Sequence, residues 1–347
     1  MVYQALGKDR GIVMHKIKIA QIGTSVNSHG NDIFNCLKRN SDVFEIVGYH
    51  FPESEREKFP HRMADFKGYK ELSIDEILDN PEIEAVTIEN EEVYLTRYAQ
   101  MAAEHKKHIH MEKPGGIDLA DFEKLIETVK KNKTVFHTGY MYRYNPYISE
   151  LKEQIKNGEL GNIISVEAHM NCIHPKEVRQ WLENFPGGMM FFLGCHLIDL
   201  IYSIQGSPRN VIPLNKCSSV DGVTAEDFGM VVFEYENGVS FAKTSAVEPG
   251  GFERRQLVVS GTKKTVELKP IEWYVEGGCV TEKYVRESRE WNALTTKAVS
   301  EPFNRYDTMM RSFAQMVRGG KENPWSYDYE LELYKLVMKA CGGYNYV

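Results

Sequence analysis

The sequence contains no apolar run that approaches the roughly 20 residues needed to cross a bilayer. Its opening segment, residues 1–16, also lacks the long apolar stretch of a secretory signal. There is no excess of basic residues, because 42 Lys and Arg stand against 49 Asp and Glu, a net charge of -7. These absences argue against a membrane protein and against nucleic acid as a partner. We interpret residues 1–16 as a short extension, with Met14 an alternative start.

The chain has only six cysteines and no Cys-x-x-Cys pair, and it shows neither internal repeats nor a low-complexity linker. Widely spaced cysteines in 347 residues fit reduced thiols better than a disulfide framework, so we expect a cytoplasmic protein. A chain of this length exceeds one ordinary core, and two domains are therefore expected.

The first 140 residues alternate between strand and helix patterns. Short β-type runs lie at residues 17–23, 43–51, 83–89, 108–111 and 134–140. Apolar residues at helical spacing lie between them, and one such helix follows the cap residue Asp118. This alternation predicts an α/β fold with a doubly wound parallel sheet, a Rossmann domain over residues 15–141.

After about Tyr142 the pattern changes to longer β-type runs, including "FGMVVFEYENGVSFAKTSA" with Asn237-Gly238 at its centre. Asn-Gly between alternating strands is a strong hairpin signal. Helical patterns return at residues 305–318 and 328–341. We therefore predict a C-terminal α+β domain, residues 142–347, with a large and mostly antiparallel sheet.

The first strand-to-helix turn, "GTSVNSHG", carries an incomplete dinucleotide fingerprint. On the template G-x-G-x-x-G it gives Gly23, Ser25 and Ser28, and Ser28 can also cap the following helix. The acid expected on the second strand is absent, because that strand ends in Phe51 and the nearest acid is Glu53. Phe51 fits a core residue better than an adenine-stacking one, and a plain turn is an equally good interpretation of this stretch.

The fourth strand ends in Glu112-Lys113-Pro114, followed by two glycines. Ligands of doubly wound sheets bind at the carboxyl ends of strands, so a lysine fixed there lies over a cleft. A lone Lys-Pro is usually only a turn. The position at the strand end makes the triplet informative.

Residues 190–204 predict an almost wholly apolar helix that carries one histidine and one acid. His196 and Asp199 are three residues apart and share a face, which Phe192 joins four residues earlier. A satisfied core histidine is the plain alternative. A buried ionisable pair is costly unless it is paired or used, and we therefore favour a functional role.

These motifs, "MEKPGGI", "GYMYRYNP" and "PGG…LGCHLIDL", match the Gfo/Idh/MocA oxidoreductases in order and spacing. The chain resembles this glucose–fructose oxidoreductase and inositol dehydrogenase group from about Ile17 onward. The resemblance implies a Rossmann domain, a second domain whose open sheet forms a homodimer or homotetramer, and NAD- or NADP-dependent chemistry on a sugar-like small molecule.

The resemblance also implies residue roles. Lys113 contacts the nicotinamide ribose and the substrate hydroxyl, His196 is the usual catalytic histidine, and Asp199 is the substrate-side acid. We predict that all three are catalytic residues. Lysine charge stabilises alkoxide character as hydride leaves, while His196 takes the hydroxyl proton. We predict cofactor binding by Gly23, Thr24, Ser25, Ser28, Asn90, Glu112 and Lys113, and substrate binding by Arg143, Asn145, Trp181 and Asp199.

The chain departs from the family pattern in three places. The glycine fingerprint is reduced to Gly23, Phe51 takes the place of the ribose-binding acid, and Phe192 stands where many relatives carry an aspartate. Two alternatives therefore stay open beside a dehydrogenase. One is a catalytically silent binding or regulatory protein, and the other is an elimination or hydrolysis enzyme that recycles a tightly held NAD.

Two further clusters of polar residues could bind a ligand. His105, His108 and His110 suggest a metal site, but no Cys or acid completes a ligand set, and we predict no metal. The stretch "HPKEVRQW" places His174, Lys176 and Arg179 near the predicted pocket. Recognition of an anionic sugar and a solvated loop are equally good interpretations of this stretch.

Overall fold

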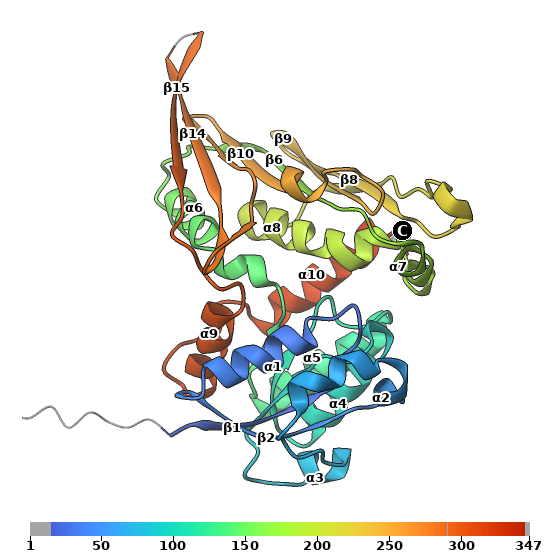
Figure 1. The fold of residues 1–347 in the computed structure, drawn as a ribbon. Helices are drawn as coiled ribbons and strands as arrows, with labels where there is room; N and C mark the ends of the chain where they lie inside the picture. The colour runs from blue at the N-terminus through green and yellow to red at the C-terminus, as the bar shows by residue number, and fades with distance from the viewer. Residues whose placement is uncertain (1–14, 290, 344–347) are drawn as a thin grey trace, which may run out of the picture.

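The structure is a computed structural model that describes residues 15–289 and 291–343. The expected extension through Met14 lies outside the described residues. Figure 1 shows two sheets stacked one above the other, with most of the helices between and around them. Residues 15 to about 144 form the lower layer of this view, most later residues form the upper layer, and the helix Asp307–Val317 lies beside the lower layer.

The first sheet is parallel and has five strands in the order β2-β1-β3-β4-β5. The strands are β1 (Ile17–Ile22), β2 (Phe44–His50), β3 (Ala85–Ile88), β4 (His108–Met111) and β5 (Phe136–Thr138). The helices are α1 (Gly30–Arg39), α2 (Glu55–Lys58), α3 (Ile74–Leu78), α4 (Leu95–Glu104) and α5 (Leu119–Asn132). The predicted doubly wound parallel sheet is confirmed. Strand order reverses between β1 and β3, where such sheets bind ligands.

The second sheet has eight strands in the order β15-β14-β11-β10-β6-β9-β8-β7. Only the β6–β9 pair is parallel, so the predicted, mostly antiparallel sheet is confirmed. The strands are β6 (Ile163–Asn171), β7 (Asn210–Pro213), β8 (Phe228–Tyr235), β9 (Gly238–Ser245), β10 (Gln256–Gly261), β11 (Lys264–Leu268), β14 (Glu282–Arg289) and β15 (Asn292–Val299). A small separate sheet pairs β12 (Trp273–Val275) with β13 (Gly278–Val280).

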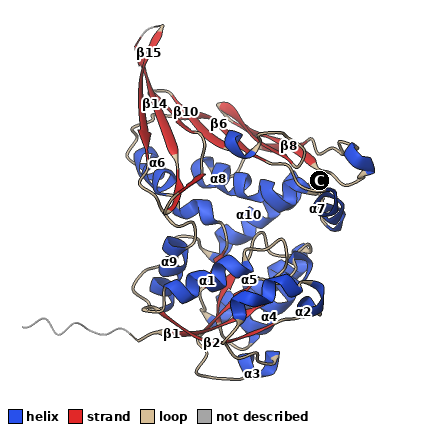
Figure 2. Cartoon of the chain, in the orientation of Figure 1, coloured by secondary structure: helices blue, strands red, loops and turns tan. Residues whose placement is uncertain are grey.

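Helices cover one face of the second sheet and leave the other face open (Figure 2). Helices α6 (Pro146–Lys156) and α8 (Cys195–Gln205) lie on the covered face, and α7 (Lys176–Trp181) lies at its edge. Val166, Ala168 and Met170 alternate along β6 and are buried, as expected for strand residues that face a helical layer. The open face carries the partly exposed residues between them.

The last two helices connect the two layers. In α9 (Asp307–Val317), Asp307 accepts a hydrogen bond from Arg39 of α1 at 3.0 Å. In α10 (Tyr327–Ala340), the Tyr334 ring stacks on Phe122 of α5 at 4.1 Å. These helices form where the sequence predicts them, and they fix the first sheet against the second.

Local sequence signals explain the element ends. The Asp118 side chain accepts a hydrogen bond from the backbone N–H of Asp121, which confirms the predicted cap of α5. The hairpin predicted at Asn237-Gly238 joins β8 to β9. Among the residues described, no helix is long and apolar enough to cross a membrane.

Candidate active site

Lys113 lies directly beyond the end of β4 and is almost completely buried, with 1% of its surface exposed. Its Nζ donates a hydrogen bond to the backbone carbonyl of Phe192 at 2.8 Å and lies 3.4 Å from Glu112 Oε1. Burial acts to lower the pKa of Lys113, but interactions with Cys195, Glu112 and Glu92 outweigh it and raise the pKa. The site therefore holds a fixed buried cation.

The chain is helical from Met190 to Gln205, as the sequence predicts, but its first turn, Met190–Gly194, is a π turn that precedes α8. A π turn widens the helix and interrupts its regular hydrogen bonds, and such turns are frequent at functional sites. Here the Phe192 carbonyl accepts a hydrogen bond from the Lys113 ammonium group. The irregular turn therefore connects the lysine at the strand end to the helix that carries His196.

The Phe192 side chain faces the same lysine. Lys113 Nζ lies 4.5 Å from the centre of the Phe192 ring, within the range of a cation–π interaction. Trp181 packs against this ring at 5.0 Å and His174 at 6.0 Å. The Phe192 ring thus stabilises the cation through its face, and its other neighbours are the Trp181 and His174 rings.

His196 lies one turn beyond Phe192 on the same helix and is 1% exposed. The rings of Tyr140 and Tyr142 flank it at 5.7 and 5.6 Å. Neither ring nitrogen of His196 has a hydrogen-bond partner among the described residues. Burial, and next the Lys113 charge, hold its pKa well below the ordinary value. His196 is therefore a neutral imidazole with its hydrogen-bonding atoms free for a ligand.

Asp199 and Arg143 bind each other. Arg143 donates to the Asp199 carboxylate from Nη2 at 2.7 Å and from Nε at 3.0 Å, and its Nη1 reaches Glu330 at 2.6 Å. Tyr329 adds a bond to Asp199 at 3.3 Å. Arg143, Asp199 and Glu330 are buried. The hydrogen bonds among them occupy the charged groups of the two predicted residues, Arg143 and Asp199, without a substrate. The structure does not bring them to His196 or Lys113 by any hydrogen bond.

Asn145 caps α6. Its Oδ1 accepts from the N–H groups of Tyr147 and Ile148, and its Nδ2 donates to Thr281 Oγ1 at 2.8 Å. Both ends of the amide are therefore engaged in local structure. Of the four predicted substrate residues, only Trp181 lies against the Lys113–Phe192 pair.

The Gly23 turn packs tightly against the loop after β3. Gly23 has φ +85, and a Cβ there would come within 2.4 Å of the Asn90 backbone, so only glycine fits. The Ser25 N–H donates to Glu89 O at 3.0 Å, and the Ser28 hydroxyl donates to the same oxygen at 2.8 Å. The turn is largely satisfied by the protein's own groups.

Glu55 was missed by the sequence analysis, although it binds the turn directly. It is fully buried, and its Oε2 accepts from Thr24 N–H at 2.7 Å and its Oε1 from Glu91 N–H at 3.2 Å. Burial raises its pKa to about 8. Glu53, the acid that the sequence singled out, instead binds Arg97 at 2.9 Å. The turn of α2 that projects Glu55 inward is not visible in the sequence pattern.

Arg62 and Phe51 complete this side of the turn. Arg62 lies across it and donates to Thr24 Oγ1 at 3.3 Å and to Ser28 O at 3.2 Å. Phe51 packs against Tyr49 and Phe66, which confirms that it is a core residue.

Three buried carboxylates, Glu89, Glu92 and Glu112, lie close enough to act on one another, and Glu92 and Glu112 also act on Lys113. Glu89 and Glu92 have no hydrogen-bond partner on either side-chain oxygen, and Glu112 has none on Oε1, among the residues described. Burial raises the pKa of Glu92 to about 8 and that of Glu89 well above its ordinary value. The strand-end argument that identified Glu112 applies equally to Glu89, which follows β3, and could have found it.

These observations test whether a dinucleotide fits. At the Lys113 end, polar atoms of His196 and Asn90 lie buried without hydrogen-bond partners among the described residues, as a polar ligand site requires. At the Gly23 turn, the Thr24 N–H is held by Glu55, so a phosphate must displace that carboxylate to use it. The residues of the site therefore fit a dinucleotide once the Glu55 side chain has moved off the Thr24 N–H.

The three histidines of the weighed metal cluster have separate partners. His105 Nε2 lies 3.3 Å from Asp79, His108 accepts from Val135 N–H, and His110 pairs with His137 at 2.7 Å. Within the described ranges, no group of three potential ligands gathers. Arg179, from the stretch weighed for anion binding, is buried in ion pairs with Asp221 and Asp227.

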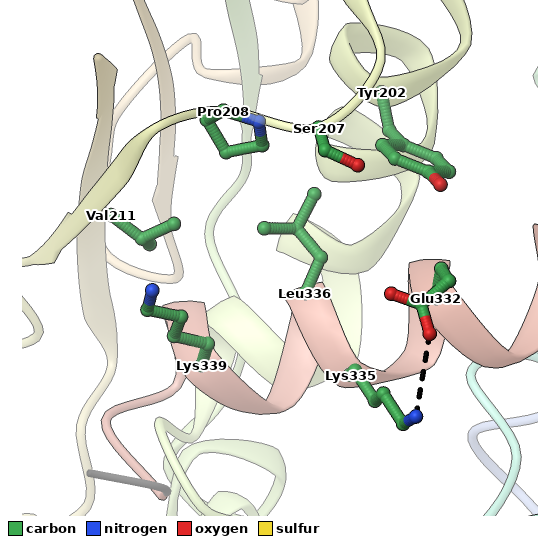
Figure 3. Close-up of a pocket in the computed structure, with 8 residues that line it drawn as sticks. All are labelled: Tyr202, Ser207, Pro208, Val211, Glu332, Lys335, Leu336 and Lys339. Carbon is green, nitrogen blue, oxygen red and sulfur yellow. Dashed lines mark hydrogen bonds and ion pairs between the residues drawn. The ribbon is translucent and has the colours of Figure 1, made fainter. Parts of the chain in front are cut away.

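A surface groove of about 300 Å³ lies away from these residues, between the end of α8, the start of β7 and α10 (Figure 3). Its charged side chains already pair locally, since Lys335 binds Glu332 at 3.3 Å and Glu123 at 3.4 Å. None of the predicted site residues lines it.

Comparison with known proteins decides the family. Residues 17–140 match the oxidoreductase family with an NAD-binding Rossmann fold, and residues 148–267 match the GFO/IDH/MocA C-terminal domain. The chain belongs to the GFO/IDH/MocA family. It is thus an oxidoreductase by family, with an NAD-binding Rossmann domain, as its motifs imply.

Two curated relatives carry named activities. The chain is 26% identical to glucose-6-phosphate 3-dehydrogenase of Bacillus subtilis, over 64% of this chain and 63% of that protein. It is 28% identical to myo-inositol 2-dehydrogenase of Thermotoga maritima, over 58% of this chain and 60% of that protein. The matches thus span about three fifths of each relative.

Solved structures share the fold of this family member. A 3-ketoreductase from Actinomadura kijaniata superposes with a TM-score of 0.78 at 15% identity, covering 95% of this chain and 98% of that one. UDP-N-acetylglucosamine 3-dehydrogenase from Acidithiobacillus ferrooxidans gives 0.74 at 15% identity, with the same coverage. At this identity the likeness establishes the fold alone.

Proposed function

We propose that this GFO/IDH/MocA protein is an NAD(P)-dependent dehydrogenase that acts on a CH–OH group of a sugar, polyol or sugar derivative. The observation that carries the proposal is the pairing of a buried lysine cation with a neutral histidine whose ring nitrogens are free, both fixed at one helix turn. The sugar and inositol dehydrogenases among its relatives support the substrate class.

The chemistry follows from the charges on these side chains. When bound, the oxidised nicotinamide supplies the hydride acceptor. The Lys113 ammonium stabilises the developing alkoxide, and the neutral His196 accepts the hydroxyl proton. Phe192 and Trp181 form an apolar wall that excludes water and strengthens the lysine's electrostatic effect. Thr24, Ser25, Ser28, Asn90 and Glu112 are the proposed cofactor contacts.

The proposal extends to the domain organisation, the location and the assembly of the protein. We place the domain boundary between residues 141 and 142, and the protein in the cytoplasm. The open face of the second sheet is the proposed interface of a homodimer or homotetramer (Figure 2). Asp199, Arg143 and Asn145 act on substrate indirectly, by holding the helix that carries His196 and the loop after β5.

A second candidate is a silent nucleotide- or sugar-binding protein of the same fold. The observation that favours it is Glu55, because a buried carboxylate on the Thr24 N–H occupies the first donor of the dinucleotide turn. This candidate predicts no turnover and weak nucleotide binding.

Calorimetry with NAD, NADH, NADP and NADPH separates the two candidates, followed by a sugar and polyol panel with nucleotide absorbance as the readout. We expect at least one nucleotide to bind and at least one polyol or sugar to reduce it. Lys113→Met should abolish turnover, while Lys130→Met, on the surface of α5, should not. Binding without turnover on the whole panel would favour the silent protein.

A further inference from the structure

A row of polar side chains crosses the buried first sheet. Gln21 pairs with Thr87, Thr87 with His110, and His110 with His137, so four neighbouring strands contribute to one row. All four side chains are at most 1% exposed. Parallel sheets covered on both faces are normally apolar at such positions, and a buried polar row requires an explanation.

The two histidines of this row form the centre of a longer chain of polar atoms. Glu89 Oε1 lies 3.6 Å from His110 Nε2, and the Nδ1 atoms of His110 and His137 lie 2.7 Å apart. His137 Nε2 lies 2.7 Å from the Tyr144 hydroxyl. Glu89, His110, His137 and Tyr144 therefore lie in one row from the end of β3 to the loop after β5. Hydrogen bonds join its last three members, and a 3.6 Å step separates Glu89 from His110.

The position of the hydrogen on each imidazole ring sets the direction in which a proton can move along this path. Burial lowers the pKa of His110 to about 3 and that of His137 well below its ordinary value, so each ring is neutral and carries one N–H. Only one of the facing Nδ1 atoms can then donate. If His110 donates, its Nε2 is free to accept from protonated Glu89, and His137 Nε2–H donates to Tyr144.

We infer that Glu89, His110, His137 and Tyr144 form a proton relay between the Lys113 site and the outside of the protein. In one passage the Glu89 carboxyl proton moves to His110 Nε2, the Nδ1 proton of His110 to His137 Nδ1, and the Nε2 proton of His137 to Tyr144. The original Tyr144 hydroxyl proton leaves, so one proton exits and no group is oxidised. Glu89 is left as a carboxylate, which takes up the proton released at the Lys113 site and is ready for the next passage. The inference rests on the proposed function, because oxidation of CH–OH releases a proton into a buried site.

Both ends of the relay have suitable neighbours. Glu89 and Glu112 follow the paired residues Ile88 and Met111, so they lie side by side on adjacent strand ends, and Glu112 is 3.4 Å from Lys113 Nζ. At the far end, the Tyr144 hydroxyl is hydrogen-bonded to the Ser312 side chain, which accepts a hydrogen bond from the exposed Lys321 at 3.0 Å. The charged groups that act on the relay are Glu112, Arg62, Glu92 and Asp32 at Glu89, and Arg143, Lys321 and Glu330 at the other members.

Nuclear magnetic resonance of ¹⁵N-labelled histidine tests the relay without a substrate. Imidazole nitrogen shifts report which ring nitrogen carries the proton. As pH rises and Glu89 loses its proton, we expect both rings to exchange tautomers together, His110 to Nε2–H and His137 to Nδ1–H. Glu89→Gln should abolish this exchange, whereas the adjacent Glu91→Gln should leave it intact.

Kinetics supply a second measurement once a substrate is found. Tyr144→Phe keeps the ring and removes the outlet, so kcat should fall by about a hundredfold with KM unchanged, and added imidazole should restore part of it. The matched control is Tyr327→Phe, whose hydroxyl donates to Thr134 O at 2.7 Å and has no contact with the relay.

The measurements distinguish a failure of the relay from a failure of the proposed dehydrogenase function. Concerted exchange that depends on Glu89 supports the relay even if no turnover is found, and in that case only the proposed function fails. Independent protonation of either histidine, or the same tautomers in wild type and Glu89→Gln at all pH values, overturns the relay. If Glu89→Gln does not fold, Tyr144→Phe decides, because unchanged kcat there also overturns it.

Discussion

Glu92 should make the stability of the protein fall as pH rises. It is 1% exposed, neither of its side-chain oxygens has a partner among the described residues, and burial raises its pKa from 4.5 to about 8. Between these values the folded chain holds a proton that the unfolded chain has released. Stability is therefore present at low pH and is lost as pH rises through about 8.

The size of the effect follows from the linkage relation. One pH unit within this window changes the free energy of unfolding by about 1.4 kcal/mol for one group. From about pH 5.5 to about pH 7.5, Glu92 should thus remove about 2.7 kcal/mol. With about 2.1 cal/mol/K of unfolding entropy per residue, that loss lowers the melting temperature of 347 residues by about 4 °C.

Thermal unfolding of wild type and Glu92→Gln across this pH range measures the effect, because the neutral amide cannot titrate. The melting temperature of wild type should fall about 4 °C further than that of the variant. Glu104→Gln is the control, since it removes a surface ion pair with Lys124, worth less than about 1 kcal/mol. Parallel curves for wild type and Glu92→Gln would refute the reasoning.

Three further predictions concern the site. Glu55→Ala should tighten dinucleotide binding by about tenfold. In the wild type, binding should weaken above about pH 8, because the Glu55 carboxylate becomes charged and repels phosphate, and the variant should lack this weakening. Calorimetry across this pH range measures both effects. His196→Ala should lower kcat by about a hundredfold on a substrate found by panel screening, and wild-type turnover and pH dependence would show that the histidine is core. Arg143→Met should destabilise the fold by about 3–5 kcal/mol, because it leaves Asp199 and Glu330 charged and unpaired. A raised KM with an unchanged melting temperature would instead show that Arg143 binds the substrate.

The fold was predictable because its signals are local. Strand runs alternating with helical periodicity specify a parallel sheet, and the Asp118 cap and the Asn237-Gly238 turn specify element ends through their own backbone hydrogen bonds. The strand-end position of Lys113 and the helical position of His196 follow from the same periodicity. Their joining through the Phe192 carbonyl does not, because a π turn leaves no periodic signature in an apolar run.

Side-chain roles at the site were less predictable, because they depend on which distant groups meet. Arg143 reads in the sequence as a free cation near the pocket, yet it is saturated by Asp199 and Glu330, which lie 56 and 187 residues away. Glu55 reads as a surface acid of a short charged helix, yet it is buried on the Gly23 turn.

The sequence by itself determined the parallel sheet, the second antiparallel sheet and the identity of the lysine and histidine, since periodicity and short motifs encode these within a few residues. Tertiary structure alone decided how the charges are used. It buried Glu89, Glu92 and Glu112 close enough to act on one another, and it aligned His110 with His137 by strand register. Proton affinity depends on burial and on neighbours from other strands, and no single segment of the chain contains that information.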